Sequence, residues 1–130
     1  MTVDEIETAL GQRLETMTGV LPIAWPNRDF EPSGKYCEFR HSPGDVVDPV
    51  VSGGFGYREG IALITVAVPS GEYTALANVE AQKIADRFPK ALRLPAGNGN
   101  VVISAPSSPR PGFQSGDYWR APVRVSYITE

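Results

Sequence analysis

The sequence predicts an α+β domain in which an antiparallel sheet of about four strands is backed by two helices, in the order α-β-β-α-β-β. Three observations support this class. The stretch from Tyr57 to Pro69 carries apolar side chains on both faces of an extended chain, which is typical of a central strand. Two other segments repeat apolar residues at three- and four-residue steps, as amphipathic helices do. The 130 residues fit one domain, 1-130, with a single core.

The overall composition excludes several classes of protein. The net charge is −3 and no Lys/Arg cluster occurs, which argues against a protein held to DNA chiefly through phosphate contacts, and we expect no sequence-specific nucleic-acid partner. No apolar run approaches the roughly 20 residues of a membrane span, and no signal segment opens the chain. The one cysteine, Cys37, excludes an internal disulfide. We therefore expect an intracellular protein without a membrane partner.

The first helix is predicted over residues 3–18. Thr2 and Glu5 fit a capping box, in which the hydroxyl and the carboxylate satisfy backbone donors at a helix start. Gly19 is a suitable stop because glycine readily adopts the left-handed cap conformation. The apolar stripe consists of Val3, Ile6, Leu10, Leu14 and Met17.

A rigid extended segment is predicted from Val20 to Pro32, because three prolines restrict its backbone. Trp25 lies between two of them. An aromatic side chain in this setting typically covers the edge of a core, and stacking on a ligand is the alternative.

Alternation predicts a strand at 35–41, followed by a long connection at 42–56 that is rich in Pro and Gly. This connection is either a hairpin with a projecting tip or two strand extensions separated by a bulge. The glycines before residue 61 fit a bulge or a close approach of two backbones. The central strand then ends at Pro69, which cannot donate to a sheet ladder.

The second helix follows the central strand and ends at Pro89. Its apolar stripe is narrow and made mostly of small residues, so the helix is expected to pack close to the sheet. We expect Glu80, Lys83 and Arg87 to face water. The stripe consists of Ala77, Ala81, Ile84, Ala85 and Phe88.

The last third of the chain is predicted to hold two strands and a second long loop. A turn at 96–100 leads to a short strand at 101–105, and the loop covers 107–116. In the closing strand, 118–128, apolar and polar side chains alternate, so one face is expected to lie on the core and the other in solvent. Its core face consists of Trp119, Ala121, Val123, Val125 and Tyr127.

No catalytic or metal constellation is evident in the sequence. His41 is the only histidine, and Asp45 and Asp48 do not lie at a spacing that favours coordination. Cys37 and His41 lack an oxyanion loop and a third group, so a half-buried structural cysteine is the simpler interpretation. We expect no enzyme activity and no cofactor.

Several short motifs together resemble those of the tail terminator, or tail-completion, proteins of long-tailed bacteriophages and prophages. They are Trp25-Pro26-Asn27 after an amphipathic helix, the strand Tyr36 to Arg40, the run from Arg58 to Gly71, the helix to Phe88, and Val123-x-Val125-x-Tyr127. The resemblance implies an α+β subunit of a hexameric ring in the virion tail, assembled in the bacterial cytoplasm. Such a ring caps the tail tube, stops tube polymerisation and meets the head-tail connector.

The two long loops are the predicted contact elements, because projecting loops can reach neighbouring subunits. The predicted interface residues are Val46, Val47, Val50, Val51, Phe55, Arg110 and Phe113. Self-packing of the valines on the sheet is the alternative. Several arginines either pair with acids of a neighbour or are simply solvated; they are Arg40, Arg58, Arg110, Arg120 and Arg124.

Two rival functions remain open at this point. One is another phage part of similar size, such as a head-tail connector or stopper. The other is a small host binding module or enzyme with a ligand cleft near Trp25 and Trp119.

Overall fold

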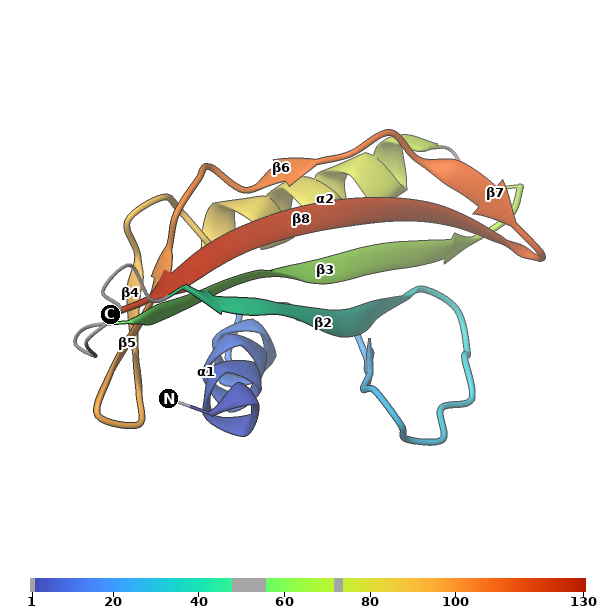
Figure 1. Ribbon diagram of the computed structural model, residues 1–130. Helices are drawn as coiled ribbons and strands as arrows, with labels where there is room; N and C mark the ends of the chain where they lie inside the picture. The colour runs from blue at the N-terminus through green and yellow to red at the C-terminus, as the bar shows by residue number, and fades with distance from the viewer. Residues whose placement is uncertain (1, 48–55, 72–73) are drawn as a thin grey trace.

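The computed structural model describes residues 2–47, 56–71 and 74–130, and these form two helices and a curved sheet of eight strands (Figure 1). The order of elements is α1 (Val3–Glu15), β1 (Ile23–Ala24), β2 (Tyr36–Val47), β3 (Tyr57–Pro69), α2 (Thr74–Arg87), β4 (Arg93–Ala96), β5 (Gly99–Ile103), β6 (Ser108–Pro109), β7 (Phe113–Ser115) and β8 (Tyr118–Thr129). The α+β class is confirmed, but four strands was too low a number.

The sheet has the strand order β1-β2-β3-β8-β5-β4, and β6 and β7 also pair with β8. The prediction of a purely antiparallel sheet is wrong because β1 pairs in parallel with the start of β2, at Cys37 and Glu38. This short strand has no alternation of its own. It forms because the extended segment before it places Ile23 and Ala24 beside an edge that needs hydrogen-bond partners.

Strand β3 is central, as its sequence predicts. It pairs with β2 on one side and with β8 on the other, in continuous register with β8 from Glu59 opposite Ile128 to Pro69 opposite Tyr118. The alternating positions Ala62, Ile64, Val66 and Val68 are all buried in the main core. We call this side of the sheet the helix face, because α1 and α2 both contribute to that core.

The opposite side of the sheet, which we call the open face, has no helix on it within the described residues (Figure 1). It is nevertheless partly closed, since Ala67 is fully buried and Thr65 is nearly so. Both faces of β3 are therefore covered toward its C-terminal end, by different means on the two sides, whereas Ile61 and Leu63 on the open face stay half-exposed.

Parts of the two predicted long connections, 42–56 and 107–116, form strands in the described residues. Strand β2 continues past residue 41 to Val47, with a register shift between Pro43 and Val46. This matches the alternative of a strand extension with a bulge. A Cβ atom at Gly60 would lie 2.8 Å from the Gly44 nitrogen, so a glycine is required where the two backbones approach.

The predicted loop at 107–116 is instead held along the second edge of β8. Ser108 and Pro109 pair with Arg124 and Val123, and Phe113 to Ser115 pair with the start of β8. With β5 these segments follow the whole length of β8. Their Pro and Gly content prevents a continuous strand, which explains why the sequence was interpreted as a loop.

Both helices differ in detail from expectation. Helix α1 ends at Glu15 with Thr16 as its C-cap, three residues before the predicted end. In α2, Glu80 is buried and lies 3.7 Å from the Lys35 ammonium and 3.5 Å from the Lys83 ammonium. It was expected to face water, but the segment before β2 covers that side of α2 and brings Lys35 onto it.

The C-terminal ends of the two helices are tied together by a reciprocal pair of arginines. Arg13 Nε donates to the Arg87 carbonyl and Arg87 Nε donates to the Arg13 carbonyl, each at 2.9 Å. Unpaired carbonyls at helix ends are thereby satisfied. Arg87 is consequently half-buried rather than facing water.

Candidate functional site

The predicted interface residues lie at separate places in the structure. The side chain of Val46 is 58 % exposed near the end of β2, and that of Phe113 is 49 % exposed on β7. Arg110 is exposed between β6 and β7. Val50, Val51 and Phe55 lie outside the described residues, and for Val47 only the backbone is described. Val46 and Phe113 are too exposed to be packed on their own sheet.

A hollow lies between α1 and the turn that follows β1; we call it the α1 groove. Its volume is about 760 Å³. Asn27 adopts a φ of 56°, which turns the chain sharply and places Arg28 at the rim. The lining residues are Asp4, Glu7, Thr8, Gly11, Gln12, Glu15, Trp25, Pro26, Asn27, Arg28 and Phe39.

The floor of the α1 groove is aromatic. The rings of Trp25 and Phe39 are 5.6 Å apart at 57°, a favourable tilted arrangement. Gly11 allows the indole to approach α1, because a Cβ atom there would be 3.1 Å from Trp25 Cζ3. Trp25 therefore covers the edge of the core, as predicted, and also exposes part of its ring to the groove.

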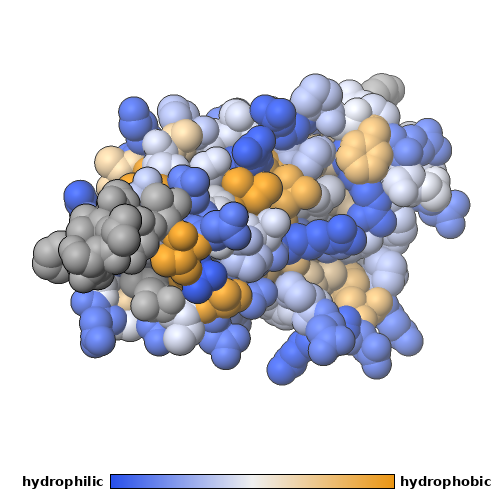
Figure 2. Space-filling model, in the orientation of Figure 1, coloured by the Kyte–Doolittle hydropathy of each residue, from blue (hydrophilic) through white to orange (hydrophobic). Residues whose placement is uncertain are grey.

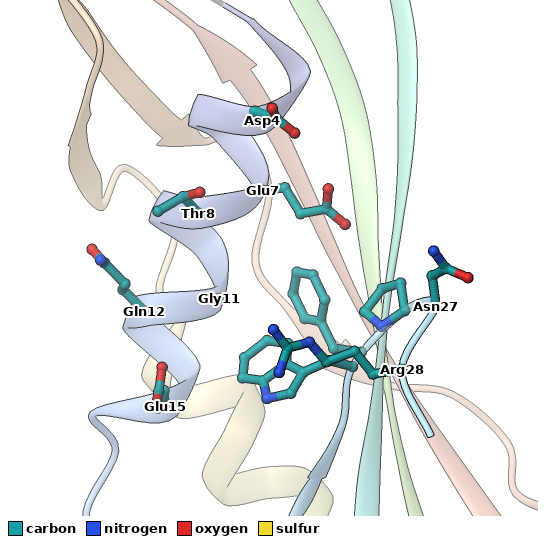
Figure 3. Close-up of a pocket in the computed structure, with 11 residues that line it drawn as sticks. Asp4, Glu7, Thr8, Gly11, Gln12, Glu15, Asn27 and Arg28 are labelled. Carbon is teal, nitrogen blue, oxygen red and sulfur yellow. The ribbon is translucent and has the colours of Figure 1, made fainter. Parts of the chain in front are cut away.

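The rim of the α1 groove is acidic. Asp4, Glu7 and Glu15 lie on α1 and Arg28 lies opposite, so the charged lining residues sum to −2. None of the three acids forms an ion pair within the described part of the chain. Figure 3 shows Glu7 reaching from α1 toward the turn that carries Asn27 and Arg28. The groove thus combines an apolar floor with unpaired negative charge.

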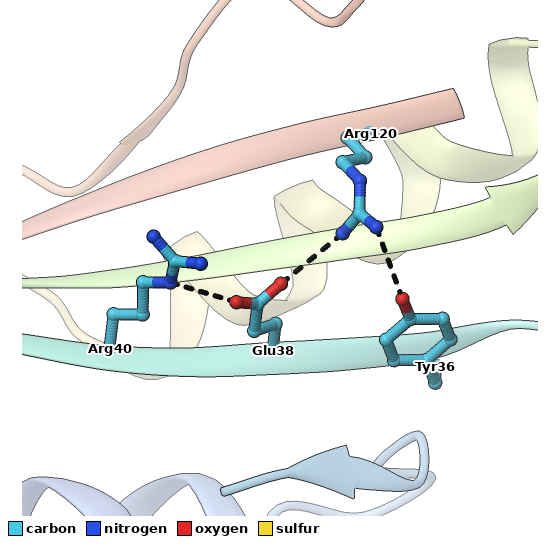
Figure 4. A network of polar contacts seen from close by, with 4 residues as sticks. All are labelled: Tyr36, Glu38, Arg40 and Arg120. Carbon is cyan, nitrogen blue, oxygen red and sulfur yellow. Dashed lines mark hydrogen bonds and ion pairs between the residues drawn. The ribbon is translucent and has the colours of Figure 1, made fainter. Parts of the chain in front are cut away.

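The open face carries a polar network that joins β2 to β8 across β3 (Figure 4). Arg120 donates to Glu38 at 3.2 Å and to the Tyr36 hydroxyl at 3.4 Å, and Arg40 donates to the other oxygen of Glu38 at 2.8 Å. These long side chains cover the small residues of β3 beneath them. Arg40 and Arg120 are therefore both paired within the chain, and the Arg40 side chain remains 73 % exposed.

The apolar surface of this side is broken up by the polar side chains. Figure 2 shows apolar patches separated by hydrophilic residues in the view that looks onto β2, β3 and β8. Arg124 on β8 is exposed and has no ion pair among the described residues. A dispersed pattern of this kind differs from the single large apolar patch that a permanent interface usually shows.

A buried polar cluster lies where β2, β3 and β8 meet α1. His41 Nε2 and the Tyr127 hydroxyl form a hydrogen bond of 2.6 Å. Burial lowers the pKa of His41, with Glu7 opposing the shift and Arg58 adding to it. Burial also raises the pKa of Tyr127. This cluster is structural in character, since Tyr127 is part of the core.

The residues considered for chemistry are not assembled for it. Burial raises the pKa of the Cys37 thiol to about 12, and His41 is bonded to Tyr127. Cys37 is fully buried, where half-burial was expected. No group of three or more potential metal ligands comes together within residues 2–47, 56–71 and 74–130. In the same ranges, no helix is long and apolar enough to cross a membrane.

Trp25 and Trp119 do not share a cleft. Trp25 lines the α1 groove, whereas Trp119 is opposite Val68 on β3 and would contact any side chain placed at Gly112. Phe39, which contacts Trp25, is opposite Ile64. Four residues therefore separate the two sites along β3, or about 13 Å.

Sequence reasoning missed two surface features. One is the α1 groove, which depends on how the turn after β1 meets α1. The other is an exposed apolar pair on α2, Leu76 and Val79, at 47 % and 54 % exposure. Their signal was present in the sequence, because both fall outside the stripe formed by Ala77 and Ala81.

Comparisons with known proteins identify a family for this chain and two solved structures with a similar fold. A family described as phage tail terminator protein matches residues 5–127. One solved structure, which carries no functional description, aligns with a TM-score of 0.82 at 24 % identity and covers 100 % of this chain and 96 % of that chain. A chain from the virion of a native gene transfer agent particle aligns with a TM-score of 0.69 at 14 % identity, covering 98 % and 96 %. Among curated proteins no relative matches significantly.

Proposed function

Because the chain belongs to the phage tail terminator protein family, we propose that it caps the tail tube as a ring, ends tube polymerisation and forms the surface that joins the tail to the head connector. Members of this family are structural virion proteins and not enzymes. The chain is therefore a component of the virion tail. The match over residues 5–127, almost the whole chain, is the observation that carries the proposal.

The partners in this proposal are other copies of the chain, the tail tube protein and the head-tail connector protein. The ring is proposed to be a hexamer, as in the resemblance that the sequence motifs provide. A closed ring of identical subunits requires two different surfaces on each subunit that fit one another. Exposed apolar side chains at distant places, Val46 on β2 and Phe113 on β7, support a subunit with more than one contact surface.

The proposal is tested by adding the protein to growing tubes of the tail tube protein from the same particle. A terminator acts on tube ends, so an amount far below that of tube subunits should stop elongation. Electron microscopy should show one ring per capped end and tubes that no longer lengthen. Unchanged elongation at every ratio would contradict the proposal.

The alternative of a head-tail connector or stopper is tested by adding tailless heads to the same experiment. A stopper should bind the connector of tailless heads and leave free tube ends growing. A tail terminator should bind tube ends first, and only the capped tails should then join heads. The order of addition therefore separates the two functions.

A further inference from the structure

Resting on the ring proposed above, we infer that the α1 groove of one subunit receives Arg110 and Phe113 of a neighbouring copy of this chain. The contact places an aromatic side chain on the aromatic floor of the groove and a guanidinium at its acidic rim. The α1 groove and the segment that carries Arg110 and Phe113 are thus proposed to bind each other between identical subunits.

The inserted segment is exposed and held in place. Phe113 is 49 % exposed although it belongs to a strand paired with β8. Arg110 donates its backbone N–H to the Pro122 carbonyl at 2.7 Å, so its backbone is fixed to β8. Its side chain is exposed and forms no ion pair among the described residues. A preordered segment loses little conformational entropy on binding.

The receiving groove has the matching chemistry. Its volume of about 760 Å³ lies in the range of pockets that hold large side groups. Trp25 is partly exposed and offers its ring to a third aromatic side chain, and the buried ring of Phe39 packs against it 5.6 Å away. Glu7 and Glu15 are two of the three unpaired carboxylates that line the groove and can accept from a guanidinium, and charge-assisted bonds of this kind are among the stronger ones.

The two surfaces cannot meet within one subunit. The groove adjoins β1 and β2, whereas Phe113 lies on β7 beyond β8, and Figure 1 shows these on opposite sides of the sheet. Four strand spacings separate β1 from β7, about 19 Å. Phe113 is also opposite Arg120, which places it on the open face. A contact between different surfaces of identical subunits is head-to-tail, the type that generates rings.

The test uses two variants of the full chain that each damage one side of the contact. Arg110→Glu leaves the groove intact, and Glu7→Arg/Glu15→Arg leaves the inserted segment intact. Each variant alone should require a protein concentration at least about tenfold higher than the wild type for ring formation or tube capping. Combining all three substitutions in one chain restores opposite charges and should recover assembly. In an equimolar mixture of the two variants, the groove of each can receive the segment of the other with opposite charges, so rings in which the two variants alternate should form as well.

Matched controls separate this contact from general effects. Arg124→Glu makes the same charge change at an exposed arginine of β8, and Leu76→Ser removes a side chain as exposed as Phe113. Phe113→Ser should weaken assembly by at least about tenfold, and both controls should assemble as the wild type does. Circular dichroism verifies that every variant is folded.

The possible failures are distinguishable by light scattering and the tube assay together. If the wild type neither forms rings nor stops tube growth, the proposed function fails and the contact fails with it. If the wild type assembles and Arg110→Glu, Phe113→Ser and the groove variant assemble equally well, the proposed function stands and this contact is overturned. Binding of a small organic cation in the groove with unchanged assembly would likewise overturn it.

Discussion

The helix face and the open face of the same three strands are closed in different ways. On the helix face, side chains such as Ile64 and Phe39 are buried by other apolar groups from α1 and α2. On the open face, Ala67 is equally buried, but beneath the polar side chains of Arg120, Glu38 and Tyr36. Burial of a strand residue therefore does not by itself identify a core, because charged side chains with long stems can cover small ones.

The largest difference between the faces should appear in thiol reactivity. Cys37 lies on the helix face with a pKa raised by burial to about 12 from an ordinary 9.0. At pH 8 its thiolate fraction is roughly a thousandfold lower than that of an ordinary thiol, and access is blocked as well. Alkylation kinetics should show Cys37 reacting at least about a thousandfold more slowly than a cysteine on the open face.

Ser42→Cys in a Cys37→Ala background supplies that reference, since Ser42 is exposed on β2 opposite Ile61. If native Cys37 reacted within tenfold of it, the helix face would be far more open than the structure indicates.

Truncation on the helix face should be the costliest change to stability. Ile64→Ala removes a fully buried side chain from the centre of the core. The loss of transfer free energy and the remaining cavity should lower the free energy of unfolding by about 3 kcal/mol. Urea denaturation followed by circular dichroism measures it. A loss below 1 kcal/mol would mean that the helices do not pack on β3.

The polar end of the helix face should make stability depend on pH. His41 faces Glu7 from α1, Arg58 from β3 and Tyr127 from β8, and burial lowers its pKa below the ordinary 6.5. The unfolded chain then binds a proton more readily than the folded one. The stability that depends on neutral His41 is therefore fully present above pH 6.5 and falls as the pH drops from 6.5 toward the folded-state pKa. The slope cannot exceed about 1.4 kcal/mol per pH unit, the value for one proton.

Urea titrations across this range, for the wild type and for His41→Gln, check the assignment. The variant should lose the slope below 6.5. Equal slopes in both proteins would assign the dependence to carboxylates.

The smallest effect is expected on the open face. Arg120→Ala removes an ion pair whose partners are 22 % and 26 % exposed, and uncovers Ala67. Solvent screening keeps the loss to about 1 kcal/mol in the same urea assay. Arg40→Ala is the control, because Arg40 pairs with the same carboxylate but is 73 % exposed and should cost almost nothing. A loss from Arg120→Ala as large as that from Ile64→Ala would remove the distinction between the faces.

The elements that were predicted well are those with a strong local period. Strand β3 has the predicted bounds, and the stripes of both helices face the core because their apolar residues recur with the helical repeat. The failures have a different cause. Strands β6 and β7 contain or adjoin Pro and Gly and show no alternation, and they become strands only because β8 has a second edge that requires partners.

The candidate site was predicted only in part, for a similar reason. Arg110 and Phe113 were singled out as exposed contact residues, and their contact with a neighbour remains a prediction. The groove that we propose as their partner was not foreseen, since it arises from three segments that are distant in sequence. Gly11 was an available signal, because a glycine inside a helix often marks close packing.

The long ladder between β3 and β8 also has a mechanical meaning for a tail component. Its hydrogen bonds run perpendicular to the strands over the whole length from Glu59 to Pro69. A pull along the strands loads all of these bonds at once, whereas a pull across them opens the ladder one bond after another. A subunit that is pulled parallel to β3 should therefore resist a larger force than one that is pulled across the strands.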